Sequence, residues 1–485
     1  EKRLYINEMV CEGCGDCGEQ SNCVAVVPKE TSFGRKRAIH QSACNLDYAC
    51  KKGFCPSFVT VVGGSIRKGQ RQAEFARFAD SLLLEPDVSP MSGNYSILLT
   101  GVGGTGVVTV GAIIGMAAHL AGKGVSVLDM AGLARKGGAV TTHIVLAETP
   151  DDITATHVAD GGADLLLGCD VVTSASVENL VKMRDGTTAV INSYQMMSGG
   201  FAHDPDSRFP LTELMAAISE RTGHNRVRSI DSTTVATAAF GDALASNLII
   251  LGYGFQLGGI PLPSIAIERA IELNGVAVEM NLSAFAWGRL AAHDLKTAEG
   301  EAEKRVTKNP TTELSQNIEQ VVGRRMKYLT KYQDQSYAKR YLSLVDQAKN
   351  AEATKTPGTK GFTEAVAKYA FKAMAYKDEY EVARLHSDGT FMEKIRQTFD
   401  GGYKLTFHLA PPLFAPRNPK TGVARKLTFG PWVMFVFKIL SKMKGLRGTP
   451  FDIFGYTAER RRERQLVEDY TQIIEELVIN LDHQN

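Results

Sequence analysis

The amino-acid sequence predicts a multidomain α/β protein with a small cysteine-rich module, an open and mostly parallel sheet, and a mainly α-helical C-terminal domain. Seven of the eight cysteines lie between Cys11 and Cys55. From Tyr95, a strand, a glycine-rich turn and a helix follow one another, which is the order of an α/β fold. Beyond residue 298, apolar residues recur at helical spacing. We therefore expect a cysteine module over 1–65, a linker over 66–92, an α/β domain over 93–297 and a helical domain over 298–485.

The cysteine spacing is typical of iron–sulfur proteins. The two runs are Cys11-x2-Cys14-x2-Cys17-x5-Cys23 and Cys44-x5-Cys50-x4-Cys55-Pro56. In bacterial ferredoxins, three cysteines at two-residue intervals bind one cluster, and a distant cysteine followed by proline completes it. The spacing therefore predicts a ferredoxin-like module in which a first 4Fe-4S cluster is held by Cys11, Cys14, Cys17 and Cys55.

The second half of the cysteine pattern departs from this rule at Asp47. In the frame C-x2-D-x2-C from Cys44 to Cys50, Asp47 stands where the middle cysteine would be. Cys23, Cys44 and Cys50 are the remaining thiolates, and Asp47 is the candidate fourth ligand. Because a carboxylate is a harder ligand than a thiolate, the iron at this corner should be labile. We expect either a 4Fe-4S cluster with an aspartate ligand or a 3Fe-4S cluster with that corner empty.

Zinc and disulfides explain the cysteines less well. Zinc sites use separated C-x2-C pairs, which three consecutive cysteines at this interval fit poorly. Disulfides are typical of exported chains, and no secretory signal is recognisable, so we expect a cytoplasmic protein with reduced thiols. Cys169 lies in an apolar run and is expected to be a buried apolar residue.

Basic residues surround the cysteines. Individually we expect them to lie on a solvated surface, but together they would stabilise anionic clusters or steer an acidic electron carrier. They are Lys29, Arg35, Lys36, Arg37, Lys51 and Lys52.

The composition is that of a soluble globular protein, with 44% hydrophobic and 22% charged residues among 485. A formal net charge of +2 gives no reason to expect a nucleic acid or an anionic membrane as a partner. The apolar run 432–437 is too short to span a bilayer and is expected to be core.

The α/β domain is predicted to begin as a Rossmann-like unit. A strand over 96–100, a helix over 107–120 and a strand over 125–128 surround a G-x-G-x-x-G turn. The glycines permit close backbone approach, and the helix N-terminus offers unpaired N–H groups to an anion. The predicted binding residues are Gly101, Gly103, Gly104, Thr105, Gly106 and Arg135.

The ligand of this turn is left open. Asp129, near the end of the second strand, is the only candidate for the acidic residue of an NAD site. A second glycine-rich turn over 133–138, with Arg135 and Lys136, instead favours a phosphate, a carboxylate or a docking surface. Further elements are expected at 164–168, 188–191, 211–221, 236–251 and 264–273.

The remaining segments are predicted to be mainly helical. A short helix is expected at 73–84 in the linker, and a proline-rich irregular segment at 410–419. The last helix, over 457–481, is expected to pack or dock through an apolar face. That face contains Leu466, Ile473, Leu477 and Leu481.

These motifs together resemble the 2-oxoacid:ferredoxin oxidoreductases, and more closely the C-terminal part of the fused indolepyruvate ferredoxin oxidoreductases. The stretches that carry the resemblance are Val10–Cys17, Cys50–Pro56, and Gly101–Gly106 with Arg135 and Gly137-Gly138. The resemblance implies that 93–297 is the family's gamma domain, and that the region after 298 is the extra domain of the fused enzymes. Lys136 departs from the Arg-Gly-Gly loop of the family.

The resemblance implies oxidative decarboxylation of an aryl 2-oxoacid, such as indolepyruvate, to an acyl-CoA, with electrons leaving through the clusters to a ferredoxin. It also implies thiamine diphosphate, Mg and coenzyme A in the complete, oligomeric enzyme. No thiamine motif is recognisable and the chain begins with Glu1, so we expect the thiamine site upstream or on a partner chain. We assign no catalytic residue to this chain.

Three other functions remain open. The first is an iron–sulfur electron-transfer subunit of a flavin- or NAD-dependent oxidoreductase. The second is an NAD-dependent oxidoreductase that uses the glycine turn directly. The third is a scaffold whose clusters only stabilise the fold.

Overall fold

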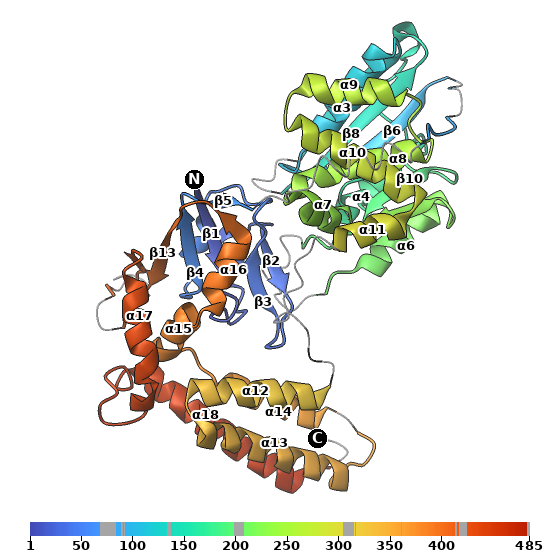
Figure 1. Ribbon diagram of the computed structural model, residues 1–485. Helices are drawn as coiled ribbons and strands as arrows, with labels where there is room; N and C mark the ends of the chain where they lie inside the picture. Colours follow the sequence, from blue (N-terminus) through green and yellow to red (C-terminus); the bar gives the residue numbers. More distant parts are fainter. Residues whose placement is uncertain are drawn as a thin grey trace.

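The computed structural model is organised as three regions, with the cysteine module between the α/β domain and the C-terminal helices (Figure 1). The helix expected at 73–84, except Leu84, and the loop 133–136 with Arg135 lie outside the described residues. The described residues are 1–67, 84–88, 91, 93–132, 137–197, 208–303, 315, 317–359, 361–412, 415–416 and 424–482.

The cysteine module is built on two antiparallel pairs of strands. β1 (Lys2–Ile6) pairs with β4 (Phe58–Val62), so that the two ends of the module meet. The hairpin of β2 (Val26–Lys29) and β3 (Lys36–Ile39) lies between them in sequence. Two short helices, α1 (Asp16–Ser21) and the 3-10 helix η1 (Ala49–Lys52), carry cysteines.

The C-terminal region completes the sheet of the cysteine module. β13 (Lys404–Leu409) pairs antiparallel with β4, and β14 (Leu427–Phe429) pairs with β13, which gives the order β1-β4-β13-β14. A second pairing joins β12 (Phe399–Asp400) to β5 (Ser65–Ile66). The first and last regions were expected to be separate domains, but the buried strand β4 has a neighbouring strand on each side, and one of them is β13.

The α/β domain contains a six-stranded sheet in the order β11-β10-β9-β6-β8-β7. The pairs β6–β9, β9–β10 and β10–β11 are parallel, whereas β8 is antiparallel to both β6 and β7. The sheet is therefore mixed, and the insertion of β8 beside β6 was not predicted. Its strands are β6 (Tyr95–Val102), β7 (Gly124–Ala131), β8 (Ala139–Ala147), β9 (Leu165–Gly168), β10 (Thr188–Asn192) and β11 (Val227–Ile230).

Alternating residues of β6 divide the core of this domain between the two faces of the sheet. Ile97 and Leu99 belong to the larger core cluster, whereas Leu98 belongs to the other. Helices α4 (Val171–Ser174) and α6 (Leu211–Thr222) cover the Leu98 side. The opposite side is covered by α3 (Val107–Leu120), α7 (Ser232–Phe240), α8 (Ser246–Gln256), α9 (Ser264–Asn274) and α10 (Val278–His293).

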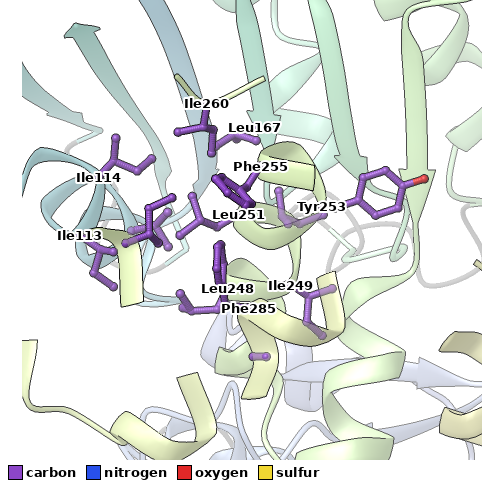
Figure 2. Close-up of a cluster of buried hydrophobic side chains, with 14 of the residues drawn as sticks. Ile113, Ile114, Leu167, Leu248, Ile249, Leu251, Tyr253, Phe255, Ile260 and Phe285 are labelled. Atoms are coloured by element: carbon purple, nitrogen blue, oxygen red, sulfur yellow. The ribbon is translucent and has the colours of Figure 1, made fainter. Parts of the chain in front are cut away.

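The larger core depends on close contact between α8 and α10. Figure 2 shows Leu251 and Phe255 of α8 beside Phe285 of α10 and near Ile113 and Ile114 of α3. A side chain at Gly252 would overlap the carbonyl of Phe285, and one at Gly288 would overlap the carbonyl of Ile249. Glycine at both positions therefore allows the two backbones to touch.

One predicted helix is divided in the structure. The stretch 236–251 was expected to be continuous, but α7 ends at Phe240. Gly241 has a φ of +70°, a left-handed conformation that ends the helix. Asp242 then caps the 3-10 helix η4 (Ala243–Ala245) before α8 begins.

The C-terminal region is mainly helical, as predicted, but two of its apolar faces differ from expectation. In α18 (Ala458–Asn480), Leu466 and Ile473 are 52% and 53% exposed, whereas Val467 and Ile474 are buried. In the run 432–437, the expected core residue Trp432 is exposed. The other helices are α11 (Leu295–Glu303), α12 (Ile318–Tyr332), α13 (Gln335–Lys355), α14 (Phe362–Met374), α15 (Glu379–Ser387), α16 (Thr390–Thr398) and α17 (Val433–Lys442).

The helical spacing predicted in α12 and α13 forms the second core. Leu329 and Tyr332 of α12, and Tyr341 and Val345 of α13, are buried together. Val10, next to the first cysteine, belongs to the same cluster. Among the described residues, no helix is long and apolar enough to cross a membrane.

A buried histidine joins the C-terminal region to the cysteine module. In His386, Nδ1 lies 3.2 Å from Nδ2 of Asn7, and Nε2 lies 3.3 Å from the carbonyl oxygen of Pro56. The rings of Phe391, Phe407 and Phe437 surround it. Burial lowers the pKa of His386 to about 4, so the imidazole is neutral at neutral pH.

This pKa predicts an acid-sensitive contribution to stability. The unfolded imidazole, with a pKa near 6.5, takes up a proton before the folded one, so the free energy of unfolding falls as the pH drops from about 6.5 to 4. His386→Gln removes this contribution. The difference in unfolding free energy between the parent and His386→Gln should therefore narrow by about 2 kcal/mol between pH 7 and 5 in urea titrations.

The matched control is His119→Gln, because His119 is exposed on α3. That variant should follow the pH dependence of the parent. A His386→Gln variant whose stability difference from the parent is the same at both pH values would contradict this account.

Candidate functional site

The structure brings the seven N-terminal cysteines into one small region. Cys11, Cys17 and Cys50 are buried with apolar residues of β1 and β4. Cys23, Cys44 and Cys55 pack against this cluster, and Cys14 is exposed. Cys169 is buried at the end of β9, as expected for an apolar core residue.

The thiols influence one another electrostatically. Burial is the largest cause that raises the pKa of Cys17 to about 12, and the charges of Cys55, Cys11, Cys14 and then Cys50 add to it. For Cys50, the pKa is likewise raised to about 12, first by burial and then by Cys23 and Cys44. Cys50 acts on Cys17 as well as responding to Cys23 and Cys44, so the influences cross between the two sets. The first thiol group (Cys11, Cys14, Cys17 and Cys55) and the second (Cys23, Cys44 and Cys50) are therefore still defined by the sequence spacing. Iron ligation by them stays a prediction.

Asp47 lies at the surface between Cys44 and Cys50. Its carboxylate accepts a hydrogen bond from the N–H of Ala49 at 3.0 Å. The side chain is exposed, unlike the buried thiol of Cys50. Its role as a ligand therefore also stays a prediction.

The thiol arrangement can be compared with the needs of a single metal ion. Zinc holds thiolates at about 2.3 Å, which draws them to within about 4 Å of one another. Within the part of the chain that the structure describes, no three His, Cys, Asp or Glu side chains are placed to hold one ion. In an iron–sulfur cluster, each cysteine binds a different iron, so the sulfur atoms need not surround a single ion. Which metal the cysteines bind stays a prediction.

Two of the basic residues near the cysteines are buried. Lys36 is 8% exposed and Arg37 is 2% exposed, although both were expected on a solvated surface. Burial lowers the pKa of Arg37, and the thiols of Cys17 and Cys11 oppose that change. The buried Arg37 is thus a positive charge close to the thiols of Cys17 and Cys11.

A backbone amide also points to sulfur in this group. The N–H of Gly13 donates a hydrogen bond to Sγ of Cys11 at 3.3 Å. Such bonds stabilise a thiolate more than a thiol, because the acceptor carries charge.

The C-terminal region holds the segment around the first cysteine. Asn7 donates a hydrogen bond to the carbonyl oxygen of Leu385 at 3.0 Å. The buried carboxylate of Glu8 forms ion pairs with Lys394 at 2.6 Å and with Lys29 at 2.9 Å. These contacts fix the chain where it enters the cysteine loop.

A second contact holds the loop itself. Glu12 pairs with Lys377 at 3.3 Å, and Nζ of Lys377 lies 2.9 Å from the hydroxyl of Tyr328. That hydroxyl donates to Glu381 at 2.5 Å, and Arg384 pairs with the same carboxylate at 2.6 Å. Sequence reasoning missed these residues because isolated lysines and tyrosines in helical segments form no motif.

The glycine turn joins β6 to the N-terminus of α3. Gly104 and Gly106 have φ angles of +85° and +92°, which only glycine adopts without strain. The N–H of Gly103 donates to the carbonyl of Gly138 at 2.8 Å. The amide of Asn247, from α8, donates to the carbonyl of Thr105 at 2.8 Å.

A cavity of about 330 Å³ lies between the glycine turn and the cysteine module. Gly103, Gly104 and Thr105 line one side, and Cys23 and His40 line the other. Of the other predicted binding residues, Gly101 and Gly106 do not line the cavity, and Arg135 lies outside the described residues. The cavity thus places the glycine turn that leads into α3 opposite Cys23.

Two buried polar residues that were not predicted from the sequence, Asp170 and Asn247, also line this cavity. Asp170 is 5% exposed and caps α4 by accepting hydrogen bonds from Thr173. Burial raises its pKa, while the bonds from Thr173 oppose the rise. Asn247 is buried as well. An aspartate after an apolar strand is an ordinary helix cap, so the sequence offered no signal of this placement.

The surroundings of Asp129 argue against an NAD site. In dinucleotide-binding folds, the acidic residue ends the strand next to the strand of the glycine turn. Here β8 lies between β6 and β7, which moves Asp129 about 5 Å further away. Its carboxylate accepts a hydrogen bond from Thr142 of β8 at 2.5 Å.

Two family models match the chain. Residues 96–291 match the model of the pyruvate ferredoxin/flavodoxin oxidoreductase family. Residues 318–485 match a family of unknown function, DUF6537.

Curated relatives match a part of the chain of similar length. The indolepyruvate oxidoreductase subunit IorB of Methanothermobacter thermautotrophicus is 31% identical over 201 residues, which are 41% of this chain and 98% of the relative. The subunit of the same name from Pyrococcus horikoshii is 28% identical over 207 residues, covering 41% of this chain and 97% of the relative.

Solved structures give more distant likenesses. The pyruvate oxidoreductase subunit PORC of Thermotoga maritima has 20% identity and a TM-score of 0.31, covering 41% of this chain and 97% of that one. A 2-oxoglutarate:ferredoxin oxidoreductase of Magnetococcus marinus has 17% identity and the same TM-score, covering 46% and 33%. The assignment rests instead on the match to nearly the whole IorB subunit. The chain belongs to the 2-oxoacid:ferredoxin oxidoreductase family.

Proposed function

We propose that this chain is the electron-transfer and accessory part of an aryl 2-oxoacid (indolepyruvate-type):ferredoxin oxidoreductase. In the overall reaction, the bond between the carboxylate and the keto carbon breaks, CO2 leaves, and the acyl group joins the sulfur of coenzyme A. The thiol proton is released, and two electrons pass one at a time to a ferredoxin. Thiamine diphosphate with Mg supplies the carbanion chemistry of this reaction from a partner portion of the enzyme.

The observation that carries the proposal is the pair of thiol groups beside the α/β domain of this family. Cys11, Cys14, Cys17 and Cys55 would hold a 4Fe-4S cluster. Cys23, Cys44 and Cys50, with Asp47, would hold the second cluster. These clusters supply one-electron steps when bound.

The rest of the chain supports this role with its own groups. The buried Lys36 and Arg37 would balance the negative charge of the first cluster. The cavity between Thr105 and Cys23 would accept an anionic group of the substrates, because glycine-rich turns that lead into a helix are typical anion-binding sites. We infer that the glycine turn positions coenzyme A or the 2-oxoacid close to the second cluster.

The experiment that tests the proposal uses the complete native enzyme, purified without air. It should contain thiamine diphosphate and should reduce ferredoxin only when indolepyruvate and coenzyme A are both present. Flavin or nicotinamide in its cofactor extract, without 2-oxoacid-dependent reduction, would favour an electron-transfer subunit of another oxidoreductase.

The two thiol groups predict separate losses of iron. Cys14→Ala should abolish the first cluster and Cys44→Ala the second, so each variant should lose about half of the bound iron. Cys169→Ala is the matched control and should keep all of it, because Cys169 is buried in another core. Iron analysis and electron paramagnetic resonance measure both losses. Equal iron in all three variants would contradict the assignment.

The second cluster predicts an effect of the ligand at position 47. Asp47→Cys should replace a hard oxygen ligand by a soft thiolate and should make the corner iron resistant to loss in air. The measurement is the ratio of three-iron to four-iron signals before and after brief oxidation. An unchanged ratio in Asp47→Cys would show that residue 47 does not bind iron.

The glycine turn predicts a loss of turnover without loss of iron. A Cβ at Gly103 would lie 3.3 Å from the carbonyl oxygen of Gly138 and 3.6 Å from Cγ2 of Val140, so Gly103→Val must displace the turn. We expect acyl-CoA formation to fall on the order of tenfold to a hundredfold, with unchanged cluster spectra. Gly323→Val, at an exposed and open position in α12, is the control. Full turnover in Gly103→Val would make the turn purely architectural.

A further inference from the structure

The C-terminal region contributes a lysine to the space between the two thiol groups. Lys426 directly precedes β14, and its Nζ lies 3.3 Å from the carbonyl oxygen of Lys51. Lys51 follows Cys50, a member of the second group. The same ammonium lies 5.3 Å from the ring centroid of Phe58, three residues after Cys55 of the first group.

The charges that act on Lys426 come from both groups. Burial lowers its pKa, and the thiols of Cys55, Cys17 and Cys50, together with Asp16, oppose that change. Cys55 has the largest of these effects. The lysine is therefore electrostatically coupled to the cysteines, more strongly to the first group.

The sheet fixes the position of this lysine. Leu427, the next residue, pairs with Leu409 of β13, and β13 in turn pairs with β4. Nε2 of His408, in β13, lies 2.7 Å from the hydroxyl of Thr60 in β4. The lysine is thus attached to the strand that follows Cys55 through two rows of backbone hydrogen bonds.

We propose that the C-terminal region, which matches a family of unknown function, sets the reduction potentials of the two clusters through Lys426. Reduction of a cluster adds one negative charge, and a fixed cation in a partly buried site stabilises that charge. Lys426 therefore raises the reduction potential of the first cluster and, to a smaller extent, that of the second cluster. The inference rests on the proposed iron–sulfur function.

The test is a redox titration of the full chain, purified without air and followed by electron paramagnetic resonance. Lys426→Met should lower the midpoint potential of the first cluster. At a fixed applied potential, the ratio of reduced to oxidised first cluster should fall on the order of tenfold. Lys426→Arg keeps the charge and should stay near the parent. Lys438→Met, on the exposed face of α17, is the matched control and should leave both potentials unchanged.

Iron content separates this inference from the proposed function. Intact clusters with unchanged potentials in Lys426→Met would overturn the inference and leave the iron–sulfur function standing. A parent protein without clusters would overturn the proposed function, and the inference with it.

A second neutral variant, Lys426→Gln, keeps the inference testable if Lys426→Met does not bind iron. Lys426→Gln keeps a donor for the carbonyl of Lys51, and its lowered potential would support the inference. Loss of iron from both neutral variants, but not from Lys426→Arg, would replace the tuning role with a purely structural one.

Discussion

The pairing of β13 with β4 is the contact on which the candidate site depends. It attaches a strand near the end of the chain to the strand that follows Cys55. Because β13 and its neighbours are fixed there, His386 reaches the carbonyl of Pro56 and Lys426 reaches the carbonyl of Lys51. The region of unknown function is thus structurally part of the cysteine module.

The charges around the cysteines are the second feature that shapes the candidate site. Thiols raise one another's pKa in the buried part of the module, and buried cations such as Arg37 lie beside them. A low-dielectric site strengthens the interaction between these charges. The cavity between Cys23 and Thr105 separates the cysteine module from the glycine turn. Under the proposed function, the second cluster and the glycine turn would face each other across this cavity.

Much of this arrangement could be predicted from local sequence patterns. The cysteine spacing predicted that these residues gather in one module, and the glycine turn predicted β6 and α3, because both signals lie within short stretches of chain. The pairing of β13 with β4 could not be predicted. Strands that are far apart in the sequence pair where the folded sheet leaves an edge free, and local sequence patterns do not show that edge. The insertion of β8 and the burial of Arg37 have the same origin in long-range packing. In α18, the pattern of apolar residues was ambiguous by one position, and the fold buries Val467 where Leu466 was expected.

The central claim is that the cysteine module carries two iron–sulfur clusters that transfer single electrons. Its most direct test is metal and acid-labile sulfide analysis of the intact chain purified without air, together with spectra before and after reduction. We predict iron and sulfide in nearly equal amounts and two signals that change on reduction. Colourless protein without iron, or protein containing only zinc, would contradict the account.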